Sequence, residues 1–245
     1  IHDVSVSEGV AYLAHWDAGT WMVDVSDPGD PSLVAKVRGR GPEAFLDMGS
    51  DVAHRENFEP PGNDHYAARG PGDVVGISVE SWRARGSDGG PGSVHLYDVS
   101  DPEAATQVAE ITPPPTDDPT YGGTWTTSHN FGFSGDYLFT SWYAGGVKVH
   151  DVSDPSRPVE LAHWRDEEAA WFWTAQAATA EFFVGTSLGH SVSDTAGRSG
   201  DAGVYTFPVV SGASTTPTPT PKPTTTPGGG SSPTVTATPE PTATA

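Results

Sequence analysis

Three histidines and one glutamate are the residues of this sequence best suited to holding a metal ion. His2, His65 and His129 occupy one position of an internal repeat, and Glu80 lies within the second copy. If each histidine opens the first strand of a repeat unit, and the units surround a common axis, the three imidazoles converge. Imidazole nitrogens are preferred ligands of zinc and copper, and a carboxylate can join them. The sequence thus indicates a copper or other divalent-metal site.

The alternative is a structural role for these histidines. It is favoured, because three histidines at an unknown separation are a weak indication of a metal site. Repeats preserve structural residues as faithfully as ligands. Each imidazole would then hydrogen-bond an Asp-x-Ser turn or a neighbouring unit.

Tryptophans recur near the ends of the expected second strands. They are Trp16, Trp82 and Trp142, and Trp173 stands at the start of the last unit. Rings at the mouth of a channel could stack on a sugar or an apolar ligand. Packing between repeat units is the favoured alternative, because such units bury their faces against one another.

The elements that must position these side chains follow from a thrice-repeated segment, Asp-Val-Ser-Asp-Pro. Asp and Ser side chains hydrogen-bond nearby backbone amides, while Pro fixes φ and cannot donate to a strand ladder. We therefore predict that the segment reverses the chain after a third strand. The predicted turn residues are Asp24, Asp27, Pro28, Asp98, Asp101, Pro102, Asp151, Asp154 and Pro155.

Each copy lies among four short runs of alternating apolar residues bounded by Gly, Asp, Ser and Pro, which is typical of short strands. Four strands per unit, repeated, indicate the blade of a propeller. The predicted fold is therefore an all-β propeller with four visible four-stranded blades, the last of them incomplete. The expected blades cover residues 1–38, 65–111, 129–164 and 171–209.

The last blade lacks a fourth strand, because its third strand, at 202–209, runs into a Thr/Pro-rich tail. An open edge invites aggregation, so we expect a closing strand and further blades upstream of Ile1, which makes the chain a fragment of a larger propeller. The folded domain should span residues 1–210. Residues 211–245 bury too little apolar surface to order themselves and are expected to form a disordered stalk or linker.

Composition restricts the partners. The formal net charge is -20, from 32 acidic and 12 basic residues, and there is no cysteine. Such a surface repels nucleic acid and favours a monomer, and thiol chemistry is excluded. No stretch is long enough to span a membrane.

A strongly acidic, lysine-poor chain resembles proteins of salt-loving archaea. No known catalytic motif occurs, which favours a non-enzymatic role.

The run Gly-Val-Lys-Val-His-Asp-Val-Ser-Asp-Pro-Ser-Arg-Pro-Val-Glu-Leu-Ala, residues 146–162, resembles the LVIVD repeat. That family comprises surface or secreted proteins of bacteria and archaea that are thought to form propellers. The tail resembles the spacer before the sorting anchor of haloarchaeal surface proteins. More distantly, the repeat resembles selenium-binding proteins, propellers linked to copper-dependent methanethiol oxidation.

These resemblances imply an extracellular, surface-tethered propeller that acts as a binding scaffold for a protein, glycan or small molecule. The parent protein would be anchored through a segment outside this chain. Two alternatives stay open. One is a copper or zinc enzyme of the selenium-binding type that uses the channel-mouth histidines, and the other is a carbohydrate-binding propeller.

Overall fold

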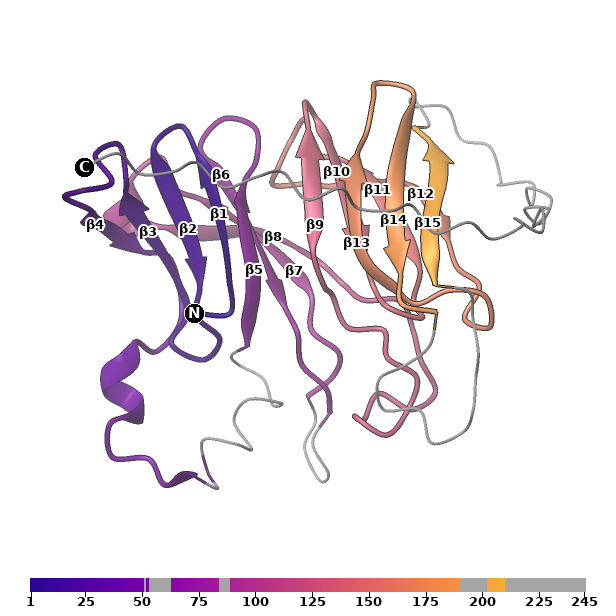
Figure 1. The fold of residues 1–245 in the computed structure, drawn as a ribbon, viewed down its shortest axis with the longest axis horizontal. Coiled ribbons are helices and arrows are strands. Elements are labelled where there is room, and N and C mark those ends of the chain that lie inside the picture. The colour runs from indigo at the N-terminus through magenta and orange to yellow at the C-terminus, as the bar shows by residue number, and fades with distance from the viewer. Residues whose placement is uncertain (51, 53–62, 84–88, 190–201, 210–245) are drawn as a thin grey trace, which may run out of the picture. The chain divides into compact units, whose positions relative to one another are not determined.

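The computed structural model describes residues 1–50, 52, 63–83, 89–189 and 202–209. The predicted tail, residues 211–245, lies outside this part of the chain. The described residues form fifteen strands in four antiparallel sheets, which we call blades 1 to 4. Figure 1 shows the blades following one another in chain order, from indigo to yellow.

Within each blade, strands adjacent in sequence are adjacent in the sheet. Blade 1 contains β1 (Asp3–Ser7), β2 (Val10–Ala14), β3 (Thr20–Asp24) and β4 (Ser32–Lys36). Blade 2 contains β5 (Asp64–Arg69), β6 (Val74–Val79), β7 (Val94–Asp98) and β8 (Thr106–Ile111). Blade 3 contains β9 (Phe131–Ser134), β10 (Tyr137–Ser141), β11 (Val147–Asp151) and β12 (Val159–Trp164). Blade 4 contains β13 (Phe172–Ala177), β14 (Phe182–Ser187) and β15 (Gly203–Pro208).

This arrangement confirms the predicted all-β, propeller-type fold, with a last blade that has three strands among the described residues. Two short 3-10 helices, η1 (Pro42–Phe45) and η2 (Pro102–Ala104), lie in the connections. No helix among the described residues is long and apolar enough to cross a membrane.

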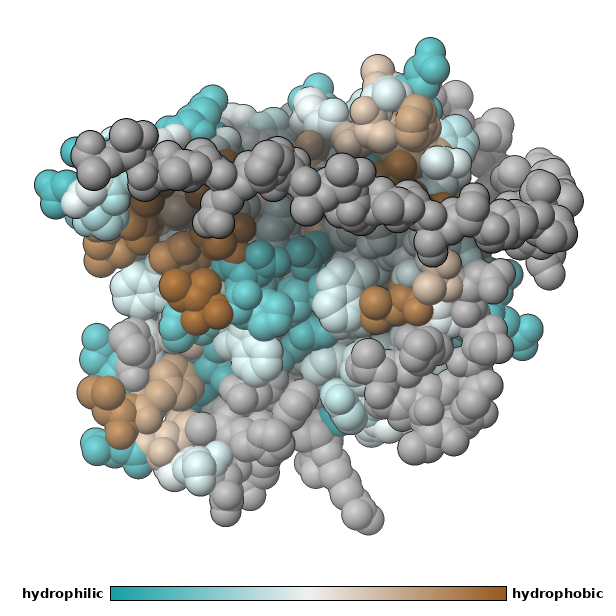
Figure 2. Space-filling view, viewed as in Figure 1, coloured by the Kyte–Doolittle hydropathy of each residue, from teal (hydrophilic) through white to brown (hydrophobic). Residues whose placement is uncertain are grey.

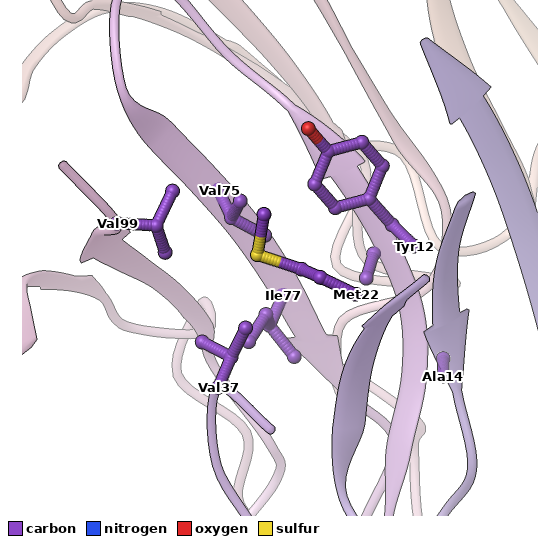
Figure 3. Close-up of a cluster of buried hydrophobic side chains, with 8 residues drawn as sticks. Tyr12, Ala14, Met22, Val37, Val75, Ile77 and Val99 are labelled. Carbon is purple, nitrogen blue, oxygen red and sulfur yellow. The ribbon is translucent and has the colours of Figure 1, made fainter. Parts of the chain in front are cut away.

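The hydrophobic core lies between neighbouring blades. Between blades 1 and 2, Met22 of β3 extends toward Val75 and Ile77 of β6, as Figure 3 shows. Comparable clusters join blade 2 to blade 3 around Phe131, and blade 3 to blade 4 around Phe172. Burial of these faces, at about 25 cal/mol per Å² of apolar surface, holds the blades in register.

The Asp-Val-Ser-Asp-Pro segments form turns at the end of the third strand of their blades. The first aspartate of each copy accepts a hydrogen bond from the backbone N–H of the serine two residues later, at 2.8 Å for Asp24, Asp98 and Asp151. The second aspartate also accepts from a backbone N–H two residues later, in the pairs Asp27–Gly29, Asp101–Glu103 and Asp154–Ser156. Local side-chain bonds of this kind are sufficient to specify a turn.

The first strands of the blades bring equivalent residues together. β1 packs beside β5, β5 beside β9, and β9 beside β13. These four strands are called the inner strands. Residues at the start of each of them therefore gather at one end of the row. This is the position of the three repeated histidines.

Candidate metal centre

His2 and His129 occupy the same backbone position in their blades. The N–H of His2 donates to the carbonyl oxygen of Ala14, and the N–H of His129 donates to that of Ser141. His65 is the equivalent residue of β5, where the pairing register with β6 shifts between Asp64 and Tyr66. A bulge of this kind disrupts the strand pairing locally and changes the direction of a side chain.

The rings at this position form a column across the four blades. Ring centroids are separated by 3.9 Å between His2 and His65, 4.1 Å between His65 and His129, and 4.0 Å between His129 and Trp173. Trp16 continues the column beyond His2, with centroids 5.3 Å apart. Trp173 thus takes the place in blade 4 that histidine has in the other blades.

The middle of the column is buried and its ends are exposed. His65 is 2% and His129 1% exposed, whereas Trp173 is 39% exposed and His2 also reaches solvent. A pocket of about 440 Å³ lies at the His2 end, lined by Ile1, His2, His15, Trp16, Asp17, Ala18 and Phe45. In Figure 2 hydrophilic residues gather in the middle of the displayed face, over the inner strands β1 and β5.

Hydrogen bonds define the protonation of two of the imidazoles. Nδ1 of His129 lies 2.6 Å from the carbonyl oxygen of Trp173, and Nδ1 of His2 lies 3.2 Å from that of His65. A carbonyl oxygen only accepts, so both Nδ1 atoms carry the proton. The lone pair of His129 is then on Nε2, which is buried and has no hydrogen-bond partner among the described residues.

His65 departs from this pattern. Its Nδ1 is buried without a hydrogen-bond partner in the described part of the chain, and its Nε2 lies 3.4 Å from a carboxylate oxygen of Glu80. The other carboxylate oxygen of Glu80 accepts a hydrogen bond from the hydroxyl of Tyr143. Ligand atoms of His65, Glu80 and His129 all lie within 4.8 Å of one another.

Burial controls the charge states of this cluster. It raises the pKa of Glu80 to about 7, against the opposing effect of the Tyr143 hydrogen bond. It lowers the pKa of His129 to about 3. Burial also lowers the pKa of His65, and the neighbouring His129 and His2 lower it further. Both buried imidazoles are therefore neutral at ordinary pH, which is the form that binds metals.

The structure corrects the predicted equivalence of Trp16, Trp82 and Trp142. Pairing of the second and third strands aligns Val10, Val74 and Tyr137, so the residue equivalent to Trp16 is Glu80 in blade 2 and Tyr143 in blade 3. Trp16 and Tyr143 also share positive φ angles, 45° and 48°. A search for repeated tryptophans missed this alignment, whereas strand spacing would have revealed Tyr143 as a site residue.

The side chains of Trp82 and Trp142 are not accessible to a ligand. They are 4% and 0% exposed, because Trp142 packs between blades 2 and 3 and Trp82 packs against other aromatic rings. The expectation that these two rings stack on a ligand is therefore wrong. Trp16 and Trp173, the other two candidates, reach solvent and end the imidazole column.

Two neutral imidazoles and a carboxylate form a donor set that suits zinc or copper. The fit rests on the unpartnered nitrogens of His65 and His129, since buried polar atoms without partners are rare in native proteins. His2 lies against His65 but outside the group of three mutually close ligands. All four predicted metal-site residues thus lie together, with His2 on the solvent side.

Comparison with known proteins identifies the repeat. The LVIVD repeat family model matches residues 1–38 and 129–165, which are blades 1 and 3. No curated protein matches the chain. Among solved structures, apo AztD from Citrobacter koseri is similar, with 13% identity and a TM-score of 0.35 over 84% of this chain and 61% of that chain. The present chain therefore spans less than two thirds of that protein's length.

The expected likenesses to haloarchaeal surface proteins and to selenium-binding proteins stay predictions. The chain therefore contains two segments that match the LVIVD repeat, and its sheets form a propeller-type fold.

Proposed function

We propose that this protein binds a zinc or copper ion between blades 2 and 3, through His65, Glu80 and His129. The supporting observation is the buried, unpartnered Nε2 of His129, whose Nδ1 is held by the Trp173 carbonyl. The second ring N–H of a metal-bound histidine characteristically donates a hydrogen bond to a carbonyl or carboxylate oxygen. Without an ion, an unsatisfied buried nitrogen costs about 1–3 kcal/mol.

Three protein ligands leave a fourth position for water, substrate or a further side chain. His2 is the nearest additional imidazole, because its ring centroid lies 3.9 Å from that of His65. An open position of this kind suits metal binding or metal-dependent chemistry.

We propose further that the protein works outside the cell, tethered at its surface, where the blades present this centre as part of a binding scaffold. The LVIVD repeats and the Thr/Pro-rich tail support this placement. Treatment of intact producing cells with a protease that cannot enter them tests it. Loss of the protein from whole cells is expected, whereas full protection would contradict the placement.

Metal titration of the purified chain tests the proposed centre. Zinc and copper are titrated separately by calorimetry, and bound metal is measured after dialysis. We expect stoichiometric binding that weakens at least about tenfold in His129→Ala, His65→Ala and Glu80→Gln, since even loss of an outer-shell partner costs 10–100-fold in affinity.

His150→Ala is the matched control, because His150 is a buried histidine outside the cluster. Thermal unfolding of each variant separates ligand loss from misfolding. Two results would contradict the proposal: no stoichiometric ion on the unmodified chain, or equal weakening by His150→Ala and His129→Ala.

A further inference from the structure

A cluster of aromatic rings lies directly beside the candidate metal centre. Its buried members are Trp82, Trp125, Tyr143 and Trp171, which pack together with Ala144. They come from the segments that follow the second strands of blades 2 and 3, from the connection before β9, and from the start of blade 4. The predicted ligand role of Trp82 does not account for this gathering.

The rings form a continuous path. The centroid of Tyr143 is 5.1 Å from that of His129 and 5.2 Å from that of Trp125. Trp125 lies 4.9 Å from Tyr121, also between centroids. Trp125 is buried, whereas Tyr121 is 44% exposed. The path therefore leads from a candidate metal ligand to the surface through two intermediate rings.

The inner end of the path has its own proton acceptor. The hydroxyl of Tyr143 donates a hydrogen bond to Glu80. A buried phenol loses an electron readily only when its proton can leave at the same time, because a charged form is costly in a buried site. The Glu80 carboxylate is positioned to take that proton.

Few other side chains compete as electron donors. The chain contains no cysteine and 2 methionines, but 8 tryptophans and 7 tyrosines. Met22 is buried in the core between blades 1 and 2, away from this cluster. Tyr and Trp rings are thus the side chains on which an oxidising equivalent formed near the centre would settle.

We propose that Tyr143, Trp125 and Tyr121 form a charge-transfer path that carries oxidising equivalents from the metal centre to the surface. With hydroxyl radical as the oxidant, one electron leaves Tyr143 and the radical becomes hydroxide. The phenolic proton moves to Glu80, so a neutral Tyr143 radical and a carboxylic acid result.

The oxidising equivalent then moves outward. Trp125 gives an electron to Tyr143, which regains its proton from Glu80. Tyr121 next gives an electron to Trp125 and releases its proton to water, and a soluble reductant such as ascorbate restores Tyr121. The net effect is the transfer of one electron from the reductant to the oxidant, which spares the buried histidines.

This path deepens the proposed metal-binding function, yet its test needs no metal. The metal-free full chain is illuminated with ruthenium(II) trisbipyridine and persulfate, frozen, and examined by electron paramagnetic resonance. Oxidation at exposed Tyr121 should exchange with Tyr143 along the path, so high-field spectra should contain the signal of a neutral tyrosyl radical that is hydrogen-bonded to a carboxyl group, as Tyr143 is to Glu80. This hydrogen-bonded signal should be lost in Tyr143→Phe and in Trp125→Phe, which keeps a ring for packing but interrupts electron transfer.

Tyr137→Phe is the control, because it removes a tyrosine whose ring contacts Phe139 instead of this cluster. Its signal should match that of the unmodified chain. A signal of unchanged size in both Tyr143→Phe and Trp125→Phe would overturn the path and leave the cluster a packing feature. Since metal affinity is measured separately, failure of the metal site and failure of the path are distinguishable.

Discussion

The Nδ1 nitrogen of His129 lies 2.6 Å from the carbonyl oxygen of Trp173, the equivalent residue of the next blade. His2 makes the same contact with the carbonyl of His65. The histidines at this repeat position thus form hydrogen bonds to the neighbouring blade. In blades 2 and 3, their buried ring nitrogens also lie close to the Glu80 carboxylate. The structural and the metal-binding interpretations of the repeated histidines are therefore compatible.

The first prediction concerns the tautomer of His129. Because its Nδ1 donates to a carbonyl oxygen, long-range ¹H–¹⁵N NMR should show a protonated Nδ1 and a bare Nε2 at neutral pH. His163 is the matched control, since its Nε2 lies 2.8 Å from the carbonyl of Gly145 and should carry the proton. A protonated Nε2 on His129 would remove the ligand atom from the proposed centre.

The second prediction concerns packing between blades 2 and 3. A Cβ added at Gly76 would lie 2.8 Å from the ring of Phe131, which is fully buried. Gly76→Ala should therefore lower the free energy of unfolding by about 1–3 kcal/mol, the usual cost of overpacking. Urea unfolding measures this. Gly90→Ala is the control, since a Cβ there meets nothing within 4 Å, and equal losses in both variants would show that the packing argument is wrong.

The third prediction concerns stability in acid. Burial lowers the pKa of His150 to about 4, and Lys148 and His163 lower it further, while Glu160 raises it. The folded state therefore keeps His150 neutral, whereas the unfolded state binds a proton below about 6.5. Stability should fall as the pH decreases from about 6.5 to about 4, by about 3 kcal/mol from this residue at about 1.4 kcal/mol per pKa unit.

His150→Gln should flatten that decline in unfolding experiments at several pH values. His15→Gln, at an exposed histidine, should leave the slope unchanged. An identical pH slope in His150→Gln and the unmodified chain would show that His150 titrates alike in both states.

The fourth prediction concerns salt. The 32 acidic residues outnumber the 12 basic ones, so the folded chain repels itself. Molar potassium chloride should screen this repulsion and raise the unfolding temperature. Because sulfate also strengthens apolar burial, chloride and sulfate series separate the two effects. Equal stability in dilute buffer and in molar chloride would count against a salt-loving origin.

Local chemistry explains why the sequence predicts so much of the fold. The turn at Asp151 depends on a hydrogen bond to Ser153, two residues away, and strand alternation depends on immediate neighbours. Neither requires knowledge of distant contacts. Repetition then predicts convergence, because residues equivalent in sequence are equivalent in neighbouring blades. His65 and His129 met that expectation.

The tryptophan alignment failed for a physical reason. A shift of one residue along a strand turns a side chain to the opposite face. Trp142 is one residue before the position equivalent to Trp16, and it is fully buried. Residue identity alone does not reveal such a shift, whereas hydrogen-bond pairing does.

The sequence by itself therefore determined the repeat, the blades, the turns and the convergence of His2, His65 and His129, since these follow from local hydrogen bonding and from symmetry. Only the tertiary structure decided which ring nitrogens are unpartnered and that the Tyr143 hydroxyl meets Glu80. Those features depend on contacts between blades, where the bulge at His65 and the packing of distant segments set the direction of each side chain.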